Sequence, residues 1–117
     1  MSGTILLVED DDDIRELMAE VLCDEGYRVI EARDGREALD RLAQNGRVCA
    51  VLLDLFMPVM NGWDFYEALR QDPQRATVPV IVISSAPDQA PDGVQRILPK
   101  PLTHQALTAA AREFCCA

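Results

Sequence analysis

Short apolar runs alternate along this chain with amphipathic helical patterns, and no other feature constrains its fold as strongly. Five runs read as strands, the last of them brief, at residues 5–8, 27–32, 48–55, 80–83 and 97–98. Most of these runs are apolar throughout, which is typical of parallel strands covered by helices on both faces. The chain is therefore predicted to be an α/β protein with a three-layer, doubly wound, five-stranded parallel sheet.

Helical periodicity fills the intervals between the strands. In the first interval, apolar residues recur at spacings of three and four and should share one helix face; they are Ile14, Leu17, Met18, Val21 and Leu22. Further helices are predicted over about 35–45, 63–71 and 104–114, with Thr103 as the N-cap of the last. Between 86 and 93, Pro87 and Pro91 leave room for at most a short helix, because proline is costly inside one.

Length and charge restrict the function classes. The 117 residues suit one domain, 1–117, with a single core. A formal net charge of −9 should repel nucleic acid and anionic lipid, so neither direct nucleic acid binding nor membrane binding is expected. We find no apolar run of about 20 residues and no basic leader, which makes a cytoplasmic location the expectation.

The four cysteines, Cys23, Cys49, Cys115 and Cys116, show no metal-ligand spacing. Cys115 and Cys116 are adjacent, and disulfide geometry makes a bridge between neighbours difficult. All four are therefore predicted to be free thiols in a reducing compartment.

Candidate functional side chains gather where the predicted strands end. The first strand ends in Glu9 and Asp10, and the third ends at Asp54. If these two strands are neighbours, three carboxylates converge and repel one another unless a cation lies among them. Mg²⁺ is the abundant hard cation with oxygen ligands. A carboxylate beside such an ion can attack phosphorus and become an aspartyl phosphate.

Two further groups follow later strands. Ser84 offers a hydroxyl and Lys100 an ammonium group that could stabilise a transferred phosphoryl group. Each signal also has a plain structural interpretation, since a serine can simply end a strand and a Lys-Pro pair can be a surface turn. Asp12 and Asp13 are better explained as acids at a helix N-terminus. The only histidine, His104, is expected to be a surface residue.

Four blocks of sequence, taken together, resemble the receiver domains of bacterial response regulators. They are residues 5–11 (ILLVEDD), 51–62 (VLLDLFMPVMNG), 79–84 (PVIVIS) and 98–101 (LPKP), and they span nearly the whole chain in family order. The resemblance implies a flavodoxin-like sheet with strand order 2-1-3-4-5. It also implies a two-state switch that accepts a phosphoryl group from a histidine kinase or phosphotransfer protein and passes the signal to an output protein or effector domain.

The resemblance assigns a role to each candidate residue. Asp54 would be the phosphoacceptor, Ser84 the switch hydroxyl, and Lys100 the phosphate partner, with a cis bond to Pro101. The implied magnesium ligands are Glu9, acting through a metal-bound water, Asp10, Asp54 and the backbone carbonyl of Phe56. The family is not one of enzymes in the ordinary sense, and at most slow self-phosphorylation from small donors is expected.

The chain also departs from the family pattern. Ile97 stands where the family often has an aromatic residue, and Ser84 and Lys100 lie only 16 positions apart. We therefore expect a shortened or irregular fourth helix and an altered output face, with a monomer or weak dimer in solution. Phe56 and Ala86 cannot orient a water molecule, which predicts slow self-dephosphorylation.

Two alternatives remain open at this point. A receiver-like fold without a switch would be an interaction module that binds partners independently of phosphorylation, although the intact set of candidate residues argues against it. A haloacid dehalogenase-like phosphatase would have an Asp-x-Asp motif on its first strand and a cap, neither of which this chain has. A nucleotide hydrolase is disfavoured because no phosphate-binding glycine-rich loop is present.

Overall fold

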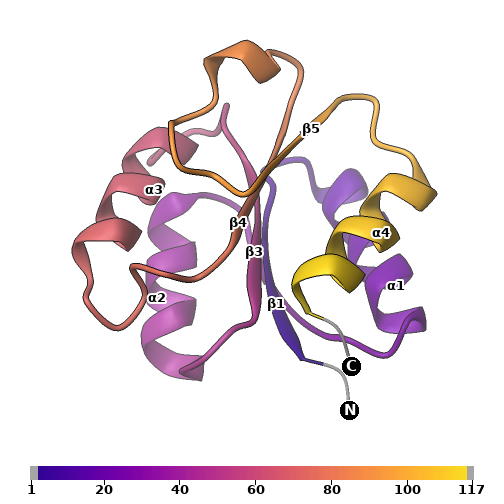
Figure 1. The fold of residues 1–117 in the computed structure, drawn as a ribbon, viewed down its shortest axis with the longest axis horizontal. Coiled ribbons are helices and arrows are strands. Elements are labelled where there is room, and N and C mark those ends of the chain that lie inside the picture. The colour runs from indigo at the N-terminus through magenta and orange to yellow at the C-terminus, as the bar shows by residue number, and fades with distance from the viewer. Residues whose placement is uncertain (1–2, 116–117) are drawn as a thin grey trace.

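The structure, a computed structural model, describes residues 3–115 as one βα series (Figure 1). The strands are β1 (Thr4–Val8), β2 (Arg28–Ala32), β3 (Ala50–Asp54), β4 (Val80–Ser84) and β5 (Arg96–Pro99). The helices are α1 (Asp12–Asp24), α2 (Gly35–Asn45), α3 (Gly62–Gln71), the short 3₁₀ helix η1 (Pro87–Gln89) and α4 (His104–Phe114). Within these residues no helix is long and apolar enough to cross a membrane.

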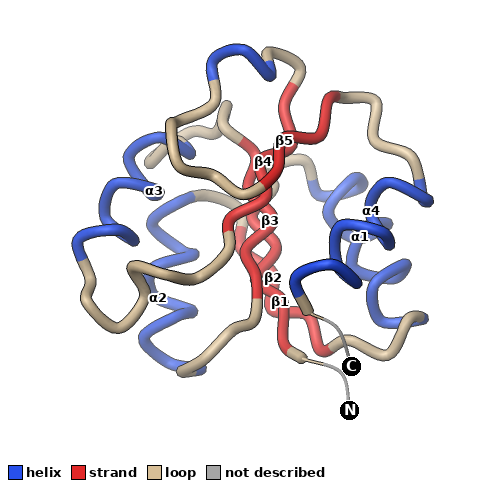
Figure 2. Tube along the Cα trace, in the orientation of Figure 1, coloured by secondary structure: helices blue, strands red, loops and turns tan. Residues whose placement is uncertain are grey.

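All five strands pair in parallel in the order β2-β1-β3-β4-β5, which confirms the predicted topology. Figure 2 shows the sheet nearly edge-on, with α2 and α3 on one side and α1 and α4 on the other. From β1 the chain first adds β2 on one side and then crosses to the other side of β1 to add β3, β4 and β5. The carboxyl ends of β1 and β3 therefore adjoin at the point where the strand order switches, which is where such sheets bind ligands.

The core consists of two apolar layers, one on each face of the sheet. Successive residues of β1 point to opposite sides, so Leu6 packs in the layer under α2 and α3 and Leu7 in the layer under α1 and α4. All residues of the central strands β3 and β4 are buried. This burial on both faces explains why these strands are almost continuously apolar.

Every α-helix begins with a side-chain cap. The capping oxygens accept a hydrogen bond from the backbone three residues on, and they belong to Asp11, Asp34, Asn61 and Thr103. The prediction of Thr103 as an N-cap is thereby confirmed. Such caps satisfy amides that the first helical turn leaves unpaired, and they set the point at which each connection leaves the sheet.

The predicted apolar face of α1 is partly wrong. Met18 and Leu22 are buried, but Ile14 is 41% and Leu17 64% exposed. Arg15 takes the inward position at the start of the helix because it has polar partners there, and this turns the buried face by about one residue. The helix consequently carries an apolar ridge that faces solvent.

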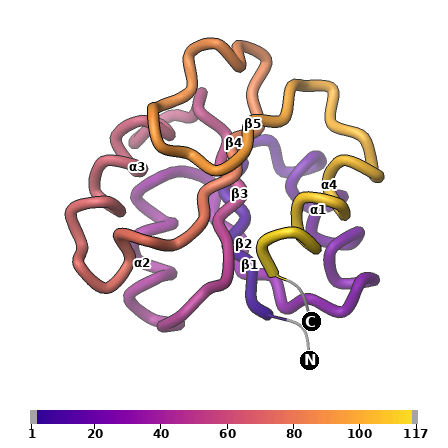
Figure 3. Tube along the Cα trace, in the orientation of Figure 1, coloured from indigo at the N-terminus to yellow at the C-terminus, as the bar shows by residue number. Residues whose placement is uncertain are grey.

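The expectation of a shortened or irregular helix between the fourth and fifth strands is confirmed. Between β4 and β5 the chain forms only η1, and Figure 3 shows this connection as a loop standing at the strand-end side of the molecule. Pro87 occupies the first turn of η1, where a missing amide proton costs nothing. Ile97 on β5 remains 41% exposed because no long helix covers its face of the strand.

The prediction that all cysteines are free thiols is wrong for one pair. Cys49 and Cys115 are joined by a disulfide, with Cα atoms 5.4 Å apart and 66 residues between them in sequence. The sheet topology brings together the entry to β3 and the end of α4, a contact that residue spacing does not reveal. Cys23 is free and exposed, whereas Cys116 lies outside the described residues.

Candidate functional site

Three carboxylates converge at the carboxyl ends of two neighbouring strands, as predicted. Glu9 and Asp10 follow β1, Asp54 ends β3, and the two strands pair with Val8 beside Leu53. Glu9 and Asp54 are buried at 3% and 4% exposure, whereas Asp10 is exposed. One oxygen from each of the three residues lies within 4.8 Å of the others. This spacing allows a single ion to contact all three.

Lys100 supplies a positive charge to the same cluster. It directly follows β5, where Ser84 pairs with Pro99, and its Nζ lies 3.2 Å from Glu9 Oε1 and 3.5 Å from Asp54 Oδ1. The peptide bond from Lys100 to Pro101 is cis, as expected. A lysine far from the acids in sequence thus becomes their direct partner.

The electrostatics of the cluster are unbalanced. The pKa of the Asp54 carboxyl is raised from its ordinary 3.8 to about 7; burial is the largest cause, the charge of Glu9 is the next, and Lys100 opposes both. Burial by itself lowers the pKa of Lys100, but the charges of Asp54 and Glu9 outweigh that effect, so the lysine pKa is raised. One ammonium group does not compensate three acids, which leaves the pocket suited to a further cation.

The donor set also fits Mg²⁺. All three side chains offer carboxylate oxygens, the hard ligands that this ion prefers, and the exposed Asp10 leaves room for the water molecules that it usually keeps. The site has no soft sulfur or imidazole ligand among the three residues.

Ser84 lies at the same edge of the sheet and is fully buried. Its Oγ accepts a hydrogen bond of 2.9 Å from the amide of Ala86, and its carbonyl accepts one of 3.0 Å from the amide of Lys100. The hydroxyl is therefore engaged with the start of the β4–η1 connection in this structure.

The loop after Asp54 is held close to the strand end by glycine. The Gly62 amide donates to the Leu55 carbonyl at 2.9 Å. A Cβ atom at Gly62 would lie 2.6 Å from the Asp54 carbonyl oxygen, so any side chain there would push the backbone of Asp54 away. Phe56, two residues beyond Asp54, is 48% exposed and packs edge-on against Trp63, with ring centroids 5.1 Å apart.

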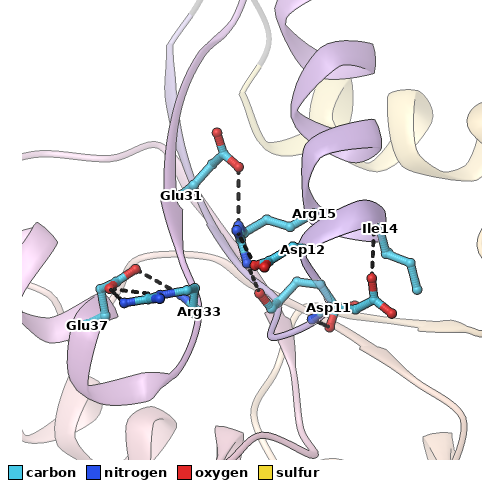
Figure 4. A network of polar contacts seen from close by, with 8 residues as sticks. Asp11, Asp12, Ile14, Arg15, Glu31, Arg33 and Glu37 are labelled. Carbon is cyan, nitrogen blue, oxygen red and sulfur yellow. Dashed lines mark hydrogen bonds and ion pairs between the residues drawn. The ribbon is translucent and has the colours of Figure 1, made fainter.

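One supporting residue was missed from sequence. Arg15 is 8% exposed and donates to the Glu9 carbonyl at 3.0 Å, to Asp12 at 2.7 Å and to Glu31 at 3.2 Å. Figure 4 shows its guanidinium group between α1 and β2, reaching toward these partners. Arg15 thereby fixes the backbone that presents Glu9. The sequence did contain a signal for this role, because Arg15 lies three and four positions before Met18 and Ala19 and therefore on the same helix face.

The residues with plain structural interpretations behave accordingly. Asp12 and Asp13 lie in the first turn of α1, and Asp12 forms an ion pair with Arg15. His104 is exposed at the first position of α4.

A doubly wound sheet of this order, with an acidic pocket facing one lysine, defines a CheY-like class of domain. The sequence matches the family model of the response regulator receiver domain over residues 5–112. The chain belongs to this family, the receiver domains of two-component response regulators, which are phosphoacceptor switches.

Curated relatives and solved structures agree with this assignment. The transcriptional regulatory protein CpxR of Escherichia coli strain K12 is 39% identical over 111 residues, covering 92% of this chain and 47% of CpxR. An uncharacterized transcriptional regulatory protein of Bacillus subtilis, YcbL, is 40% identical over 80 residues, covering 68% of this chain and 34% of YcbL. The chain thus spans less than half the length of these relatives.

Two solved structures cover nearly the whole fold. The chemotaxis response regulator CheY4 of Vibrio cholerae superimposes with a TM-score of 0.85 at 30% identity, covering 97% of this chain and 99% of CheY4. The receiver domain of the sensor histidine kinase PA1611 of Pseudomonas aeruginosa PAO1 gives 0.87 at 28% identity, covering 97% and 98%. That structure has a magnesium ion coordinated in its active site cleft.

Proposed function

We propose that this chain, as one receiver domain over residues 1–117, accepts a phosphoryl group on Asp54 in a Mg²⁺-dependent reaction and thereby switches between two conformations. The observation that carries the proposal is the convergence of Glu9, Asp10 and Asp54 within 4.8 Å, with Lys100 beside them. The donor is a phosphohistidine of a histidine kinase or phosphotransfer protein, and the setting is the cytoplasm.

Asp54 acts as the nucleophile. One carboxylate oxygen forms a bond to phosphorus while the bond between phosphorus and the donor imidazole breaks, and the imidazole retains the electron pair. The buried carboxylate must be ionised to attack, and Lys100 at 3.5 Å favours that state. Lys100 also stabilises the negative charge of the phosphoryl oxygens, and the Ser84 hydroxyl donates to the group once it is attached.

Glu9, Asp10, Asp54 and the carbonyl of Phe56 are the residues that would hold Mg²⁺. When bound, the ion neutralises the acids and supplies electrostatic stabilisation to the transferred group.

Labelling by acetyl phosphate tests the proposal. The protein with Mg²⁺ should incorporate one phosphoryl group, and Asp54→Asn should incorporate none, whereas the exposed control Asp13→Asn should label normally. Labelling of Asp54→Asn would identify another acceptor, and unlabelled wild-type protein would favour an interaction module without a switch.

The phosphorylated form should persist, because the Phe56 side chain beside the acceptor cannot orient an attacking water molecule. The decay of labelled protein measures this directly. Phe56→Asn places a polar group at that position and should shorten the lifetime, and an unchanged decay rate would contradict the argument.

This chain has a surface beside the site on which a donor protein can dock. A groove of about 740 Å³, mainly apolar, lies between α1 and the connection from β5 to α4, and Glu9 and Lys100 are among the residues that line it. The exposed Ile14 and Leu17 form one wall and Leu102 the other. We infer that a helix of the kinase or phosphotransfer protein docks here, which would bring its histidine to Asp54.

A further inference from the structure

A disulfide bond is unexpected in the setting that the proposed function implies. In the cytoplasm, thiol-reducing systems keep most cysteines reduced. Disulfides that do form there are usually transient and belong to catalytic or redox-sensing sites. The Cys49–Cys115 bond is therefore a candidate redox site, and its surroundings determine which reagent can open it.

The two sulfur atoms of this bond differ in access. Cys115 is 3% exposed, whereas Cys49 is only partly buried. The bond lies at the amino ends of the strands, where α4 ends near the start of β1 (Figure 1), and Cys49 lines a pocket of about 770 Å³ there. Gly3 lies directly against the same sulfur, since a Cβ atom at Gly3 would be 2.6 Å from Cys49 Sγ. Because Gly3 has no side chain to cover this atom, Cys49 is the cysteine that a reagent in the pocket can attack.

The pocket is positively charged in an otherwise acidic protein. Arg47 and Arg75 line it, and none of its lining residues is an acid. Arg75 is bound to Asp72 and to the Leu42 carbonyl, but Arg47 is exposed and forms no ion pair within residues 3–115. The whole chain has a formal net charge of −9, so a cation beside the accessible sulfur favours an anionic reagent at this one place.

The helix at the other end of the bond has a small apolar face. Only one buried side chain of α4 is large; the set is Leu107, Thr108, Ala110 and Ala111. By comparison, α3 buries two aromatic rings and a leucine. In the last turn of α4, Phe114 is only partly buried, and the ion pairs of Arg112 and Glu113 lie at the surface, where they contribute little. The disulfide at the C-cap is therefore a major part of what holds this end of the helix.

α4 also forms part of the groove beside the candidate site. Leu107 and the first residue of the helix line that groove, together with the exposed Leu17 of α1. An element with few buried contacts can open while the sheet stays folded, because local opening breaks only the contacts of that element. The state of the disulfide can thus change how firmly this wall of the groove is held.

We propose that the pocket beside Cys49 binds a small thiol that carries a carboxylate, and that exchange with this thiol opens the Cys49–Cys115 bond and loosens α4. The thiolate sulfur forms a bond to Cys49 Sγ while the bond between the two cysteines breaks. Cys115 Sγ leaves with the electron pair and takes a proton from water. A second thiolate then attacks the sulfur of the bound thiol and frees Cys49. The inference goes beyond the proposed function and rests on it only for the cytoplasmic setting and the role of the groove.

Rates of exchange with two matched thiols test the binding site. The anion 3-mercaptopropionate is compared with the neutral 2-mercaptoethanol, in protein that carries Cys23→Ser and Cys116→Ser so that a single bond reacts. Mass spectrometry of acid-quenched samples gives each rate, and division by the rate for urea-unfolded protein removes the difference in intrinsic reactivity of the thiols. After this correction, the anion should react about fivefold faster, the factor for attraction between unit charges about 4 Å apart in water.

Two variants identify the source of this preference. Arg47→Gln should abolish it, whereas Arg41→Gln, which removes an exposed arginine of α2 outside the pocket, should retain it. The first adduct should form on Cys49 and not on Cys115. Equal corrected rates of the two thiols in wild type, or an undiminished preference in Arg47→Gln, would overturn the proposed site.

Hydrogen exchange tests the release of α4. Reduction should speed the exchange of α4 amides at least about tenfold more than that of β4 amides, as expected for an element that opens by itself. Cys49→Ser should give the same pattern without a reductant. If α4 and β4 amides are accelerated equally, the bond only stabilises the whole fold and the inference is wrong. Labelling of Asp54 by acetyl phosphate is measured separately on the oxidised protein, so a failure of the proposed function is distinguished from a failure of this inference.

Discussion

Arg15 illustrates how one residue can serve both the fold and the site. It is a buried cation whose three partners come from the end of β1, the start of α1 and β2. Its bond to the Glu9 carbonyl orients the strand end that carries two of the candidate ligands. Removing it would leave that carbonyl unsatisfied in a region that excludes water.

Arg15→Met should therefore lower the free energy of unfolding by about 2 kcal/mol, the usual cost of losing buried hydrogen bonds from a charged donor. Arg33→Met is the matched control, because Arg33 pairs with Glu37 at the surface (Figure 4), where an ion pair contributes less than about 1 kcal/mol. Urea unfolding of both variants measures the difference. Equal effects of the two substitutions would contradict the role assigned to Arg15.

Asp54 should impose a pH dependence on stability in the absence of divalent cations. Its pKa is raised from 3.8 in the unfolded chain to about 7 in the folded protein, so the folded state holds the proton more tightly. This contribution to stability is complete below about pH 4 and is lost as the pH rises through about 7. With a chelator present, the free energy of unfolding of wild type should fall over this interval relative to that of Asp54→Asn.

Urea unfolding at several pH values between about 4 and 7.5 provides the measurement. Added Mg²⁺ should recover stability for wild type at neutral pH, because a ligand that binds only the folded state stabilises it. Parallel pH curves for wild type and Asp54→Asn would show that the carboxyl titrates normally.

At the scale of elements, the predictable features were those encoded locally. Strands β3 and β4 could be predicted because burial on both faces requires apolar residues throughout. The N-cap role of Thr103 could be predicted because capping is a local hydrogen bond. Asp54 and Lys100 were readable because the carboxyl ends of parallel strands share one edge of the sheet. The replacement of the fourth helix followed from Pro87 and Pro91.

What could not be predicted depends on contacts between distant elements. Arg15 points inward partly because it bonds to Glu31 on β2. The spacing of apolar residues within α1 contains no information about a partner on a different element. The Cys49–Cys115 bond depends on where α4 ends relative to β3. The hydrogen bonds from Trp63 to the Gln89 carbonyl and from Tyr66 to the Asp92 carbonyl likewise join residues 26 positions apart, and they have no local sequence signature.

The exposed ridge of α1 leads to a prediction about the donor. Leu17 is 64% exposed on the groove, and burying a leucine side chain in an interface is worth about 1.5–3 kcal/mol. Leu17→Gln should thus lower kcat/KM for phosphoryl transfer from the cognate kinase about tenfold or more, while labelling by acetyl phosphate stays unchanged. Glu20→Gln, on the same helix but outside the groove, is the control, and a comparable loss in that variant would argue against docking at the ridge.

At the scale of the whole molecule, the disulfide ties the last helix to the middle of the sheet. It closes a segment with 66 residues of separation, and cross-links of this size typically stabilise by about 2–4 kcal/mol. Wild-type protein should therefore unfold at lower urea concentration when a reductant is present. Cys49→Ser should be insensitive to the reductant, and Cys23→Ser should behave as wild type, because Cys23 is free.

Mass spectrometry of the alkylated protein supplies the complementary measurement. Without reductant, Cys49 and Cys115 should resist alkylation while Cys23 reacts. Full alkylation of all three, together with an unfolding midpoint that ignores the reductant, would show that the bond does not form in solution.

Glu9 and Lys100 touch although 91 positions separate them in the chain. Translation consequently delivers the acids of the pocket long before the base that balances them. A polypeptide that ends before residue 100 lacks both this ammonium group and α4, whose Leu107, Ala110 and Ala111 complete one apolar layer of the core. The pocket and the core are therefore completed by the same last part of the described chain, and under the proposed function a product cut short there would have neither the fold nor the acceptor site.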